Sequence, residues 1–242
     1  MIELHDVYKA FGKREILRGL TLTVPKGLNF VLMGPSGTGK SVTLRHIIGI
    51  LQPDRGSVRV DGQEVPAMNH HQLMELRKRM GYLFQNGALI NWLSVAENVA
   101  LPLREHGMLP RDEIDDRVHE MLRLVHMDQA AKQFPPDISG GMKLRCGLAR
   151  ALVTKPEYVL YDEPNAGLDP IISREIHELI VDVRDTLHVT GLIVTHSRAC
   201  ATHCADRIGI LQDGRLGIEG TVDELVHSDN PLARDFLGEG SD

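Results

Sequence analysis

The stretch that decides the fold is GPSGTGKS, residues 34–41. It follows LNFVLM (28–33), a short continuous apolar run of the kind that forms a buried strand. It leads into SVTLRHIIGIL (41–51), whose apolar spacing predicts a helix. A loop of the pattern G-x-x-x-x-G-K-[ST] between a strand and a helix is a phosphate-binding loop in its required context. We therefore predict an α/β protein with a P-loop NTPase core.

Each residue type in this loop has a physical reason to be there. The glycines let the backbone approach phosphate oxygens closely, and the helix N-terminus adds free N–H groups and a positive dipole end. The lysine offers a charge to the β- and γ-phosphates, and the Ser41 hydroxyl is a ligand for Mg²⁺. A glycine-rich turn with no ligand is the alternative. The predicted nucleotide contacts are Gly34, Pro35, Ser36, Gly37, Thr38, Gly39, Lys40, Ser41 and Val42.

A second motif, YVLYDEP, begins at residue 158 and contains two adjacent carboxylates, Asp162 and Glu163. The apolar residues predict a strand that carries Asp162 to its end, beside the phosphate loop. Glu163 then points to the other side of the strand end. We expect Asp162 to hold the metal ion and Glu163 to orient and deprotonate the attacking water. The alternative is a solvated, inert acidic pair at a strand–loop junction.

A second glycine-rich anion site lies in DISGGM, residues 137–142. Ser139 and the amides of Gly140 and Gly141 precede KLRCGLARALVT, which has helical spacing, and so present a positive helix end to an anion. A plain helix N-cap is the alternative. The sequence therefore predicts two anion-binding loops that lie about a hundred residues apart.

The remaining periodicity divides the chain, which we interpret as one domain, 1–242. Alternation predicts antiparallel strands in IELHDVYKAF and EILRGLTLTV, and hairpins at Asp61-Gly62 and Asp213-Gly214. Short apolar runs at 158–162 and 191–195 flank a predicted helix, which indicates parallel strands. We predict an α/β core with an N-terminal antiparallel β subdomain from 1–86 and 156–242, and a helical subdomain from 87–155.

Composition limits the classes of partner. A net charge of −6 argues against nucleic acid, because duplex binding usually needs a basic surface. The N-terminus lacks the apolar region of a signal peptide, and no run of about 18 apolar residues predicts a membrane span. Three cysteines suit a reducing compartment. A zinc site is a weaker interpretation, because its spacing is not a standard one; it would use His196, Cys200, His203 and Cys204.

Six motifs together resemble the nucleotide-binding subunit of an ABC transporter. In chain order they are GPSGTGKS, Gln85 in YLFQNG, ISGGM, YVLYDEP, AGLD ending at Asp169, and His196 in IVTHS. The resemblance covers essentially the whole chain. It implies that ATP and Mg²⁺ are the cofactors, that the chain hydrolyses ATP, and that two copies pack head to tail. Each SGG loop would then cover the nucleotide held by the partner's phosphate loop.

The same resemblance implies further residue roles. Phe11 would stack on adenine, although Tyr8 is also near. Gln85 would sense Mg²⁺, the attacking water and a membrane partner, and His196 would contact the γ-phosphate. Asp169 would lie at the dimer interface. The chain departs from the family at one position of the signature, where Met142 replaces the usual glutamine. One polar contact near the nucleotide sugar is therefore in doubt.

Longer stretches are similar to the ATPases of MCE-type lipid transporters, which include the Mla phospholipid system. They are GTGKSVTLRHIIGIL, LFQNGALINWLSVAENVALPLREHG, SGGM and DEPNAGLDPI. This resemblance implies an integral membrane permease, an MCE-domain protein, a STAS-domain protein in some systems, and a place at the cytoplasmic face of the inner membrane. Trp92 and Leu93 lie in an apolar segment suited to docking the permease.

Two other functions stay open at this point. One is an ABC transporter for small polar solutes, because the ATPase sequence contacts nucleotide and permease rather than the cargo. The other is a soluble ABC ATPase that acts on DNA, ribosomes or cluster assembly. A P-loop GTPase is disfavoured because the chain has no N-K-x-D guanine motif.

Overall fold

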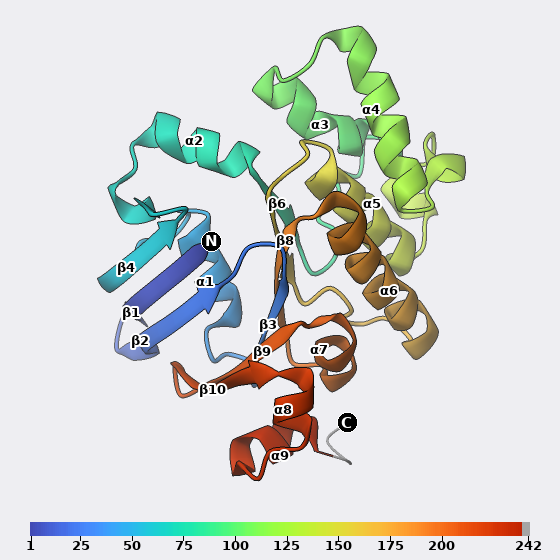
Figure 1. Ribbon diagram of the computed structural model, residues 1–242. Coiled ribbons are helices and arrows are strands. Elements are labelled where there is room, and N and C mark those ends of the chain that lie inside the picture. Colours follow the sequence, from blue (N-terminus) through green and yellow to red (C-terminus); the bar gives the residue numbers. More distant parts are fainter. Residues whose placement is uncertain (239–242) are drawn as a thin grey trace.

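The computed structural model describes residues 1–238 and contains two β-sheets with helices around them (Figure 1). The smaller sheet is antiparallel and has the strand order β2-β1-β4-β5. Its strands are β1 (Ile2–Phe11), β2 (Arg14–Val24), β4 (Arg55–Val60) and β5 (Gln63–Glu64). The two predicted N-terminal strands and the hairpin at Asp61-Gly62 are confirmed by this sheet.

The larger sheet has the strand order β10-β9-β3-β8-β7-β6. Its strands are β3 (Asn29–Met33), β6 (Met80–Leu83), β7 (Tyr158–Asp162), β8 (Thr190–Thr195), β9 (Arg207–Gln212) and β10 (Arg215–Thr221). Pairing is parallel from β9 through β6, and β10 alone of these runs antiparallel to its neighbour. The parallel arrangement brings the carboxyl ends of β3, β6, β7 and β8 to one edge, where ligands bind in sheets of this kind.

The helices lie on both sides of the larger sheet. They are α1 (Lys40–Ile47), α2 (His70–Lys78), α3 (Val95–His106), α4 (Arg111–Leu124), α5 (Gly140–Leu152), α6 (Pro170–Leu187), α7 (Arg198–Cys204), α8 (Val222–Val226) and α9 (Pro231–Leu237). Figure 1 shows α3 and α4 at the far side of the molecule from the antiparallel sheet, next to α5. In the part of the chain that the structure describes, none of these helices has the length and apolarity needed to cross a bilayer.

Alternating side chains of the central strands fill two separate cores. Phe30 and Leu32 of β3 point to the core shared with α1 and the antiparallel sheet, while Val31 and Met33 point to the core beneath α5 and α6. Successive side chains of a strand face opposite sides of its sheet, so a strand covered on both faces must be apolar throughout. This explains the continuous apolar run before the phosphate loop.

Two elements were not predicted. Apolar residues recur at helical spacing through NHHQLMELRKRM (69–80), which predicts a single helix, but α2 ends at Lys78 and Met80 starts β6, which pairs with β7. The apolar segment that contains Trp92 and Leu93 continues into α3, and Pro102 lies inside that helix. Proline argues against a helix interior, but the capping box of Ser94 with Glu97 was the signal that could have located its start.

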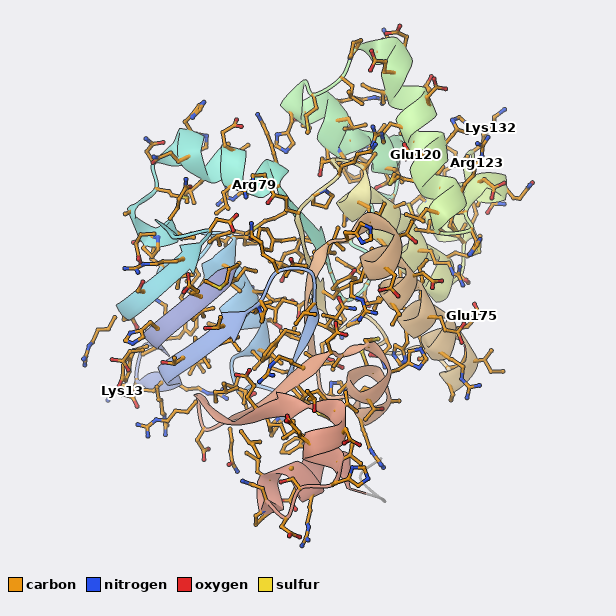
Figure 2. All side chains as sticks on the ribbon, in the orientation of Figure 1. Lys13, Arg79, Glu120, Arg123, Lys132 and Glu175 are labelled. Atoms are coloured by element: carbon orange, nitrogen blue, oxygen red, sulfur yellow. The ribbon has the colours of Figure 1, made fainter. Side chains whose placement is uncertain are left out.

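An ionic network joins the two sheets at one end. Arg79, labelled in Figure 2, donates to Glu157 through Nε (2.7 Å) and to Asp61 through Nη2 (2.5 Å). Asp61 lies in the β4–β5 turn and also accepts a hydrogen bond from the Tyr158 hydroxyl at 2.6 Å. Its donors, Lys26 among them, outweigh burial and hold the pKa of Asp61 far below its usual range. The network fixes the antiparallel sheet against the start of β7, at the end of that strand opposite the predicted site.

Candidate active site

The phosphate loop connects β3 to α1, as its motif predicted. Two of its glycines are required by close packing. A Cβ on Gly34 would lie 2.4 Å from the backbone oxygen of Leu211, and one on Gly39 would lie 2.7 Å from Leu17 Cδ2. Gly39 also has φ of 109°, which disfavours any other residue. The loop backbone is therefore held tightly between β2 and β9.

Lys40 is the cation at the base of this loop. Its Nζ donates to the carbonyl oxygens of Gly34 (2.7 Å) and Pro35 (3.0 Å) and lies 3.5 Å from Glu163 Oε1. The side chain is 5% exposed. Burial lowers the pKa of Lys40 below its ordinary value, and the carboxylate of Glu163 opposes that shift. A buried ammonium held at the base of this loop by two backbone carbonyls is well suited to binding a phosphate oxygen.

Asp162 lies at the end of β7, next to the first turn of α1. Its Oδ1 accepts a hydrogen bond from Ser41 Oγ at 2.7 Å, and its Oδ2 accepts one from the Tyr82 hydroxyl at 2.9 Å. The pairing of Ser41 with Asp162 was expected from their motifs. Tyr82, on β6, was missed because its strand was missed.

Glu163 follows in an unusual backbone conformation. Its φ is 50°, in the left-handed region, and its N–H donates to the Val194 carbonyl at 2.9 Å. This turn directs the carboxylate to His196, whose Nδ1 lies 2.9 Å from Glu163 Oε2. A strained backbone at a functional side chain is a recurring property of active sites. The expected base and the expected phosphate ligand thus form one hydrogen-bonded pair.

Six of the nine predicted residues of the phosphate loop, together with Phe11, line one cleft of about 400 Å³. Its lining is Phe11, Arg14, Ile16, Ser36, Gly37, Gly39, Lys40, Ser41, Val42, Gln85, Glu163 and His196. Phe11 lines the cleft and is 49% exposed, with Lys9 Nζ 5.7 Å from its ring centroid, whereas Tyr8 is not among the described lining and its ring lies under the guanidinium of Arg55 at 4.8 Å. The geometry therefore favours Phe11 over Tyr8 as the stacking residue. Arg14 and Ile16 belong to no motif and were not predicted.

Thr38 supports the loop from within. Its Oγ1 donates to the carbonyl of Pro35 at 2.8 Å, across the tight turn. The backbone carbonyls of Gly34 and Pro35 both accept from Lys40, so these two residues act on the cleft through the lysine.

The SGG loop lies elsewhere. Ser139 caps α5 and accepts from the Met142 N–H at 3.3 Å, and both Ser139 and Gly140 are exposed. Neither these residues nor Gly141 are among the described residues that line the phosphate-loop cleft. Asp169 caps α6 through two bonds of 3.0 Å, to the N–H groups of Ile171 and Ile172.

The two helix starts touch each other. A Cβ on Gly141 would lie 2.5 Å from Ile172 Cγ2, and one on Gly140 would lie 3.5 Å from Leu168 Cδ2. The AGLD segment therefore packs directly against the SGG loop. Met142 is half-buried against the core and does not reach the phosphate-loop cleft.

A second groove of about 450 Å³ lies beside β6, and Met80, Gly81 and Tyr82 of that strand line it. Its apolar lining includes Tyr82, Phe84, Ile90, Leu101 and Pro102. The predicted docking residues are not among its described lining, but they are close in sequence: Trp92 is 79% exposed and Leu93 is half-buried.

The two cysteines considered for zinc are buried along α7. A hydrogen bond with Cys204, together with burial, raises the pKa of Cys200 well above its usual value, so the thiol form is favoured over the thiolate that metals require. His196 is directed to Glu163 instead.

The donors at the carboxyl ends of β3 and β7 fit Mg²⁺. Ser41 and Asp162 offer a hydroxyl and a carboxylate, and Gln85 lines the same cleft. These are hard oxygen donors and few in number, which suits an ion that keeps several waters and shares its remaining positions with nucleotide phosphates.

Comparison with known proteins agrees with this geometry. Residues 17–166 match the family described as ABC transporter. The chain is 44% identical over 236 residues to the probable ribonucleotide transport ATP-binding protein Mkl of Mycobacterium bovis, covering 98% of this chain and 66% of the relative. It is 39% identical over 237 residues to the intermembrane phospholipid transport system ATP-binding protein MlaF of Escherichia coli, covering 98% of this chain and 88% of that protein.

A solved structure has the same fold. It is the dimeric, post-hydrolysis state of the ATP-binding cassette MJ0796 bound to ADP and Pi, with a TM-score of 0.83 and 30% identity. The similarity covers 92% of this chain and 99% of that one. The predicted fold class, a P-loop core of ABC type with an antiparallel β subdomain and a helical insertion, is confirmed.

Proposed function

The chain belongs to the ATP-hydrolysing subunits of the ABC transporter family, and we propose that it powers phospholipid movement between the inner and outer membranes. It does so from the cytoplasmic face of the inner membrane, bound to an integral permease. The observation that carries this proposal is the convergence of a built hydrolysis site with a relative, MlaF, whose name states phospholipid transport.

The hydrolysis chemistry rests on residues of the cleft. Loop amides, Lys40 and the α1 dipole would bind the phosphates, and Ser41, Asp162 and Gln85 would hold Mg²⁺. Bound Mg²⁺ would neutralise charge that develops on the transferred phosphoryl group. Glu163 orients the attacking water and accepts its proton. His196, hydrogen-bonded to that carboxylate, donates to the γ-phosphate when the pair separates.

Two copies form the working unit. Ser139, Gly140 and Gly141 present a helix N-terminus that is exposed and lies outside its own chain's cleft, so its natural anion is the nucleotide of a second copy. Asp169 packs behind it and would lie at the same interface. The dimeric state of the solved relative, MJ0796, supports this arrangement.

The apolar groove beside β6 is the surface we assign to the permease. A cytoplasmic helix of the permease would lay its apolar face against Phe84, Ile90 and Leu101. Gln85 lines the nucleotide cleft and directly follows Phe84, which lines this groove, so it suits a residue that senses both. An MCE-domain protein on the periplasmic side, and a STAS-domain protein in the cytosol, complete the assembly that we propose.

A second candidate cargo follows from the mycobacterial relatives, whose name states ribonucleotide transport at 44% identity. The chain spans 66% of the length of those relatives but 88% of MlaF, so MlaF is matched more completely. We favour phospholipid on that ground.

The test is an affinity purification of the tagged chain from gently solubilised native membranes, followed by mass spectrometry of proteins, lipids and nucleotides. Recovery of a permease with an MCE-domain protein and phospholipid supports the proposal. A permease with a solute-binding protein or bound ribonucleotide favours the polar cargo. Absence of any membrane protein favours a soluble ABC ATPase.

A matched pair of variants tests the docking surface in the same experiment. Phe84→Asp places a charge in the groove and should abolish permease recovery, whereas Ile50→Asp alters an apolar side chain that is 64% exposed and outside the groove. Equal recovery with both variants would refute docking in the groove.

A further inference from the structure

Tyr82 links the metal-binding carboxylate to the apolar groove. Its hydroxyl donates to Asp162 Oδ2 at 2.9 Å. Its ring packs on Phe84, with the ring centroids 4.3 Å apart, and both side chains line the groove. One side chain therefore contacts both sites.

The bond to Tyr82 completes the fixation of Asp162. Ser41 engages Oδ1 and Tyr82 engages Oδ2, so the two oxygens are held from opposite sides, one by α1 and one by β6. A carboxylate with one free oxygen can rotate about its Cβ–Cγ bond, and each rotation misplaces the oxygen that faces the metal. Residues that orient a metal ligand in this way commonly change metal affinity by about 10–100-fold when removed.

We propose that Tyr82 is a positioning residue that holds Asp162 in the orientation required to bind the Mg²⁺ of Mg-ATP. This inference rests on the proposed function, because it takes Ser41 and Asp162 as the metal site. Tyr82 is not among the described residues that line the nucleotide cleft, and its hydroxyl reaches the predicted metal site through the hydrogen bond to Asp162. It predicts a loss of Mg²⁺ affinity with intact binding of metal-free nucleotide.

The chain supplies two matched controls on β7. Tyr158 makes the same kind of bond, to Asp61 Oδ1 at 2.6 Å, at the opposite end of the strand from the site. Tyr161 is fully buried, and its hydroxyl has no hydrogen-bond partner among residues 1–238. Tyr→Phe at these positions removes, respectively, a structural Tyr–Asp bond and an unbonded hydroxyl.

The experiment titrates full-length protein with a fluorescent, non-hydrolysable ATP analogue, first in EDTA and then at fixed analogue with increasing Mg²⁺. For Tyr82→Phe we expect binding in EDTA within twofold of wild type and a midpoint for Mg²⁺ about tenfold higher. Tyr158→Phe and Tyr161→Phe should leave that midpoint unchanged, even where Tyr158→Phe lowers the melting temperature. Because Tyr82→Phe keeps the ring in the groove, permease recovery should also be unchanged.

Three outcomes overturn the inference in different ways. If Asp162→Asn raises the Mg²⁺ midpoint but Tyr82→Phe does not, the metal site stands and the positioning role is wrong. If neither Asp162→Asn nor Ser41→Ala changes the midpoint, the metal assignment itself is wrong, and the positioning role falls with it. Loss of EDTA binding in a Tyr82→Phe protein that melts like Tyr161→Phe also contradicts a role confined to the metal.

Discussion

The two glycine-rich anion loops of this chain are built in opposite ways. The phosphate loop is held between strands, and its functional side chains are already bonded to one another: Lys40 to the loop carbonyls, Ser41 to Asp162, and Glu163 to His196. In the SGG loop, Ser139 Oγ accepts one capping hydrogen bond from the Met142 N–H, and Ser139 and Gly140 are exposed. The functional side chains around the first loop have partners within their own chain, whereas the second loop presents an exposed helix end.

This difference indicates a division of labour between copies. A loop whose cations and carboxylates are mutually satisfied can bind nucleotide in a single chain. For the exposed helix end of the SGG loop, our proposal is that a second chain brings the ligand. We therefore expect variants of the first loop to change binding and chemistry in one chain, and variants of the second to act only where two copies meet.

The largest effect is expected at Glu163. Glu163→Gln keeps the shape and the contact with His196 but removes the base, so ATP turnover should fall about 10²–10⁴-fold while ATP binding stays within twofold. Phosphate release and nucleotide binding measure the two quantities separately. Glu175→Gln, on the exposed face of α6, is the control. A turnover rate of Glu163→Gln close to that of wild type would refute the role of Glu163 as the general base.

Lys40→Ala should weaken ATP binding. Removing a buried cation that would donate to phosphate costs about 1.5–3 kcal/mol, which corresponds to roughly 10–100-fold weaker ATP binding. Titration with a fluorescent ATP analogue measures it, with Lys26→Ala as a control that removes an exposed lysine from the Asp61 network. Unchanged affinity would mean that the loop binds phosphate through its amides alone.

The sequence predicted the phosphate loop far better than it predicted the side chains from other elements that surround this loop. The motif fixed the positions of Lys40 and Ser41, and the apolar run before Asp162 located the opposing strand. These are local signals, because each pattern lies within a few residues of the functional side chains that it locates. They were enough to place the predicted strand ends at one edge of the sheet, because parallel strands share an edge.

Contacts between distant segments could not be predicted in the same way. Tyr82 contacts Asp162 because β6 pairs with β7 in parallel register. No local sequence pattern predicts that pairing. Arg14 and Ile16 line the cleft because the β1–β2 hairpin folds over the loop. The contact of Gly141 with Ile172 likewise depends on how α5 and α6 pack. Periodicity predicts elements, and tertiary packing decides which of their side chains meet.

Ser139→Ala tests the second loop. It should lower turnover about tenfold at protein concentrations where dimers form, and leave binding of nucleotide to a single chain unchanged. Loss of the N-cap also destabilises α5 by about 1 kcal/mol, so Thr221→Ala, which removes the cap of α8, is the matched control for stability. Steady-state turnover as a function of protein concentration measures the effect. Weaker single-chain binding would contradict the division between the two loops.

The smallest effect is expected at Phe11. Aromatic stacking on a base contributes about 1 kcal/mol or more, so Phe11→Ala should weaken ATP binding roughly fivefold. The ring lines the cleft and is 49% exposed, so it is accessible to a base bound there. Tyr8→Ala is the control, because Arg55 already covers that ring. Phe11→Trp should restore binding if stacking is the cause. If Tyr8→Ala weakens binding more than Phe11→Ala, the adenine lies on the other side of β1, and the cleft lining assigned to the base must be redrawn around Tyr8.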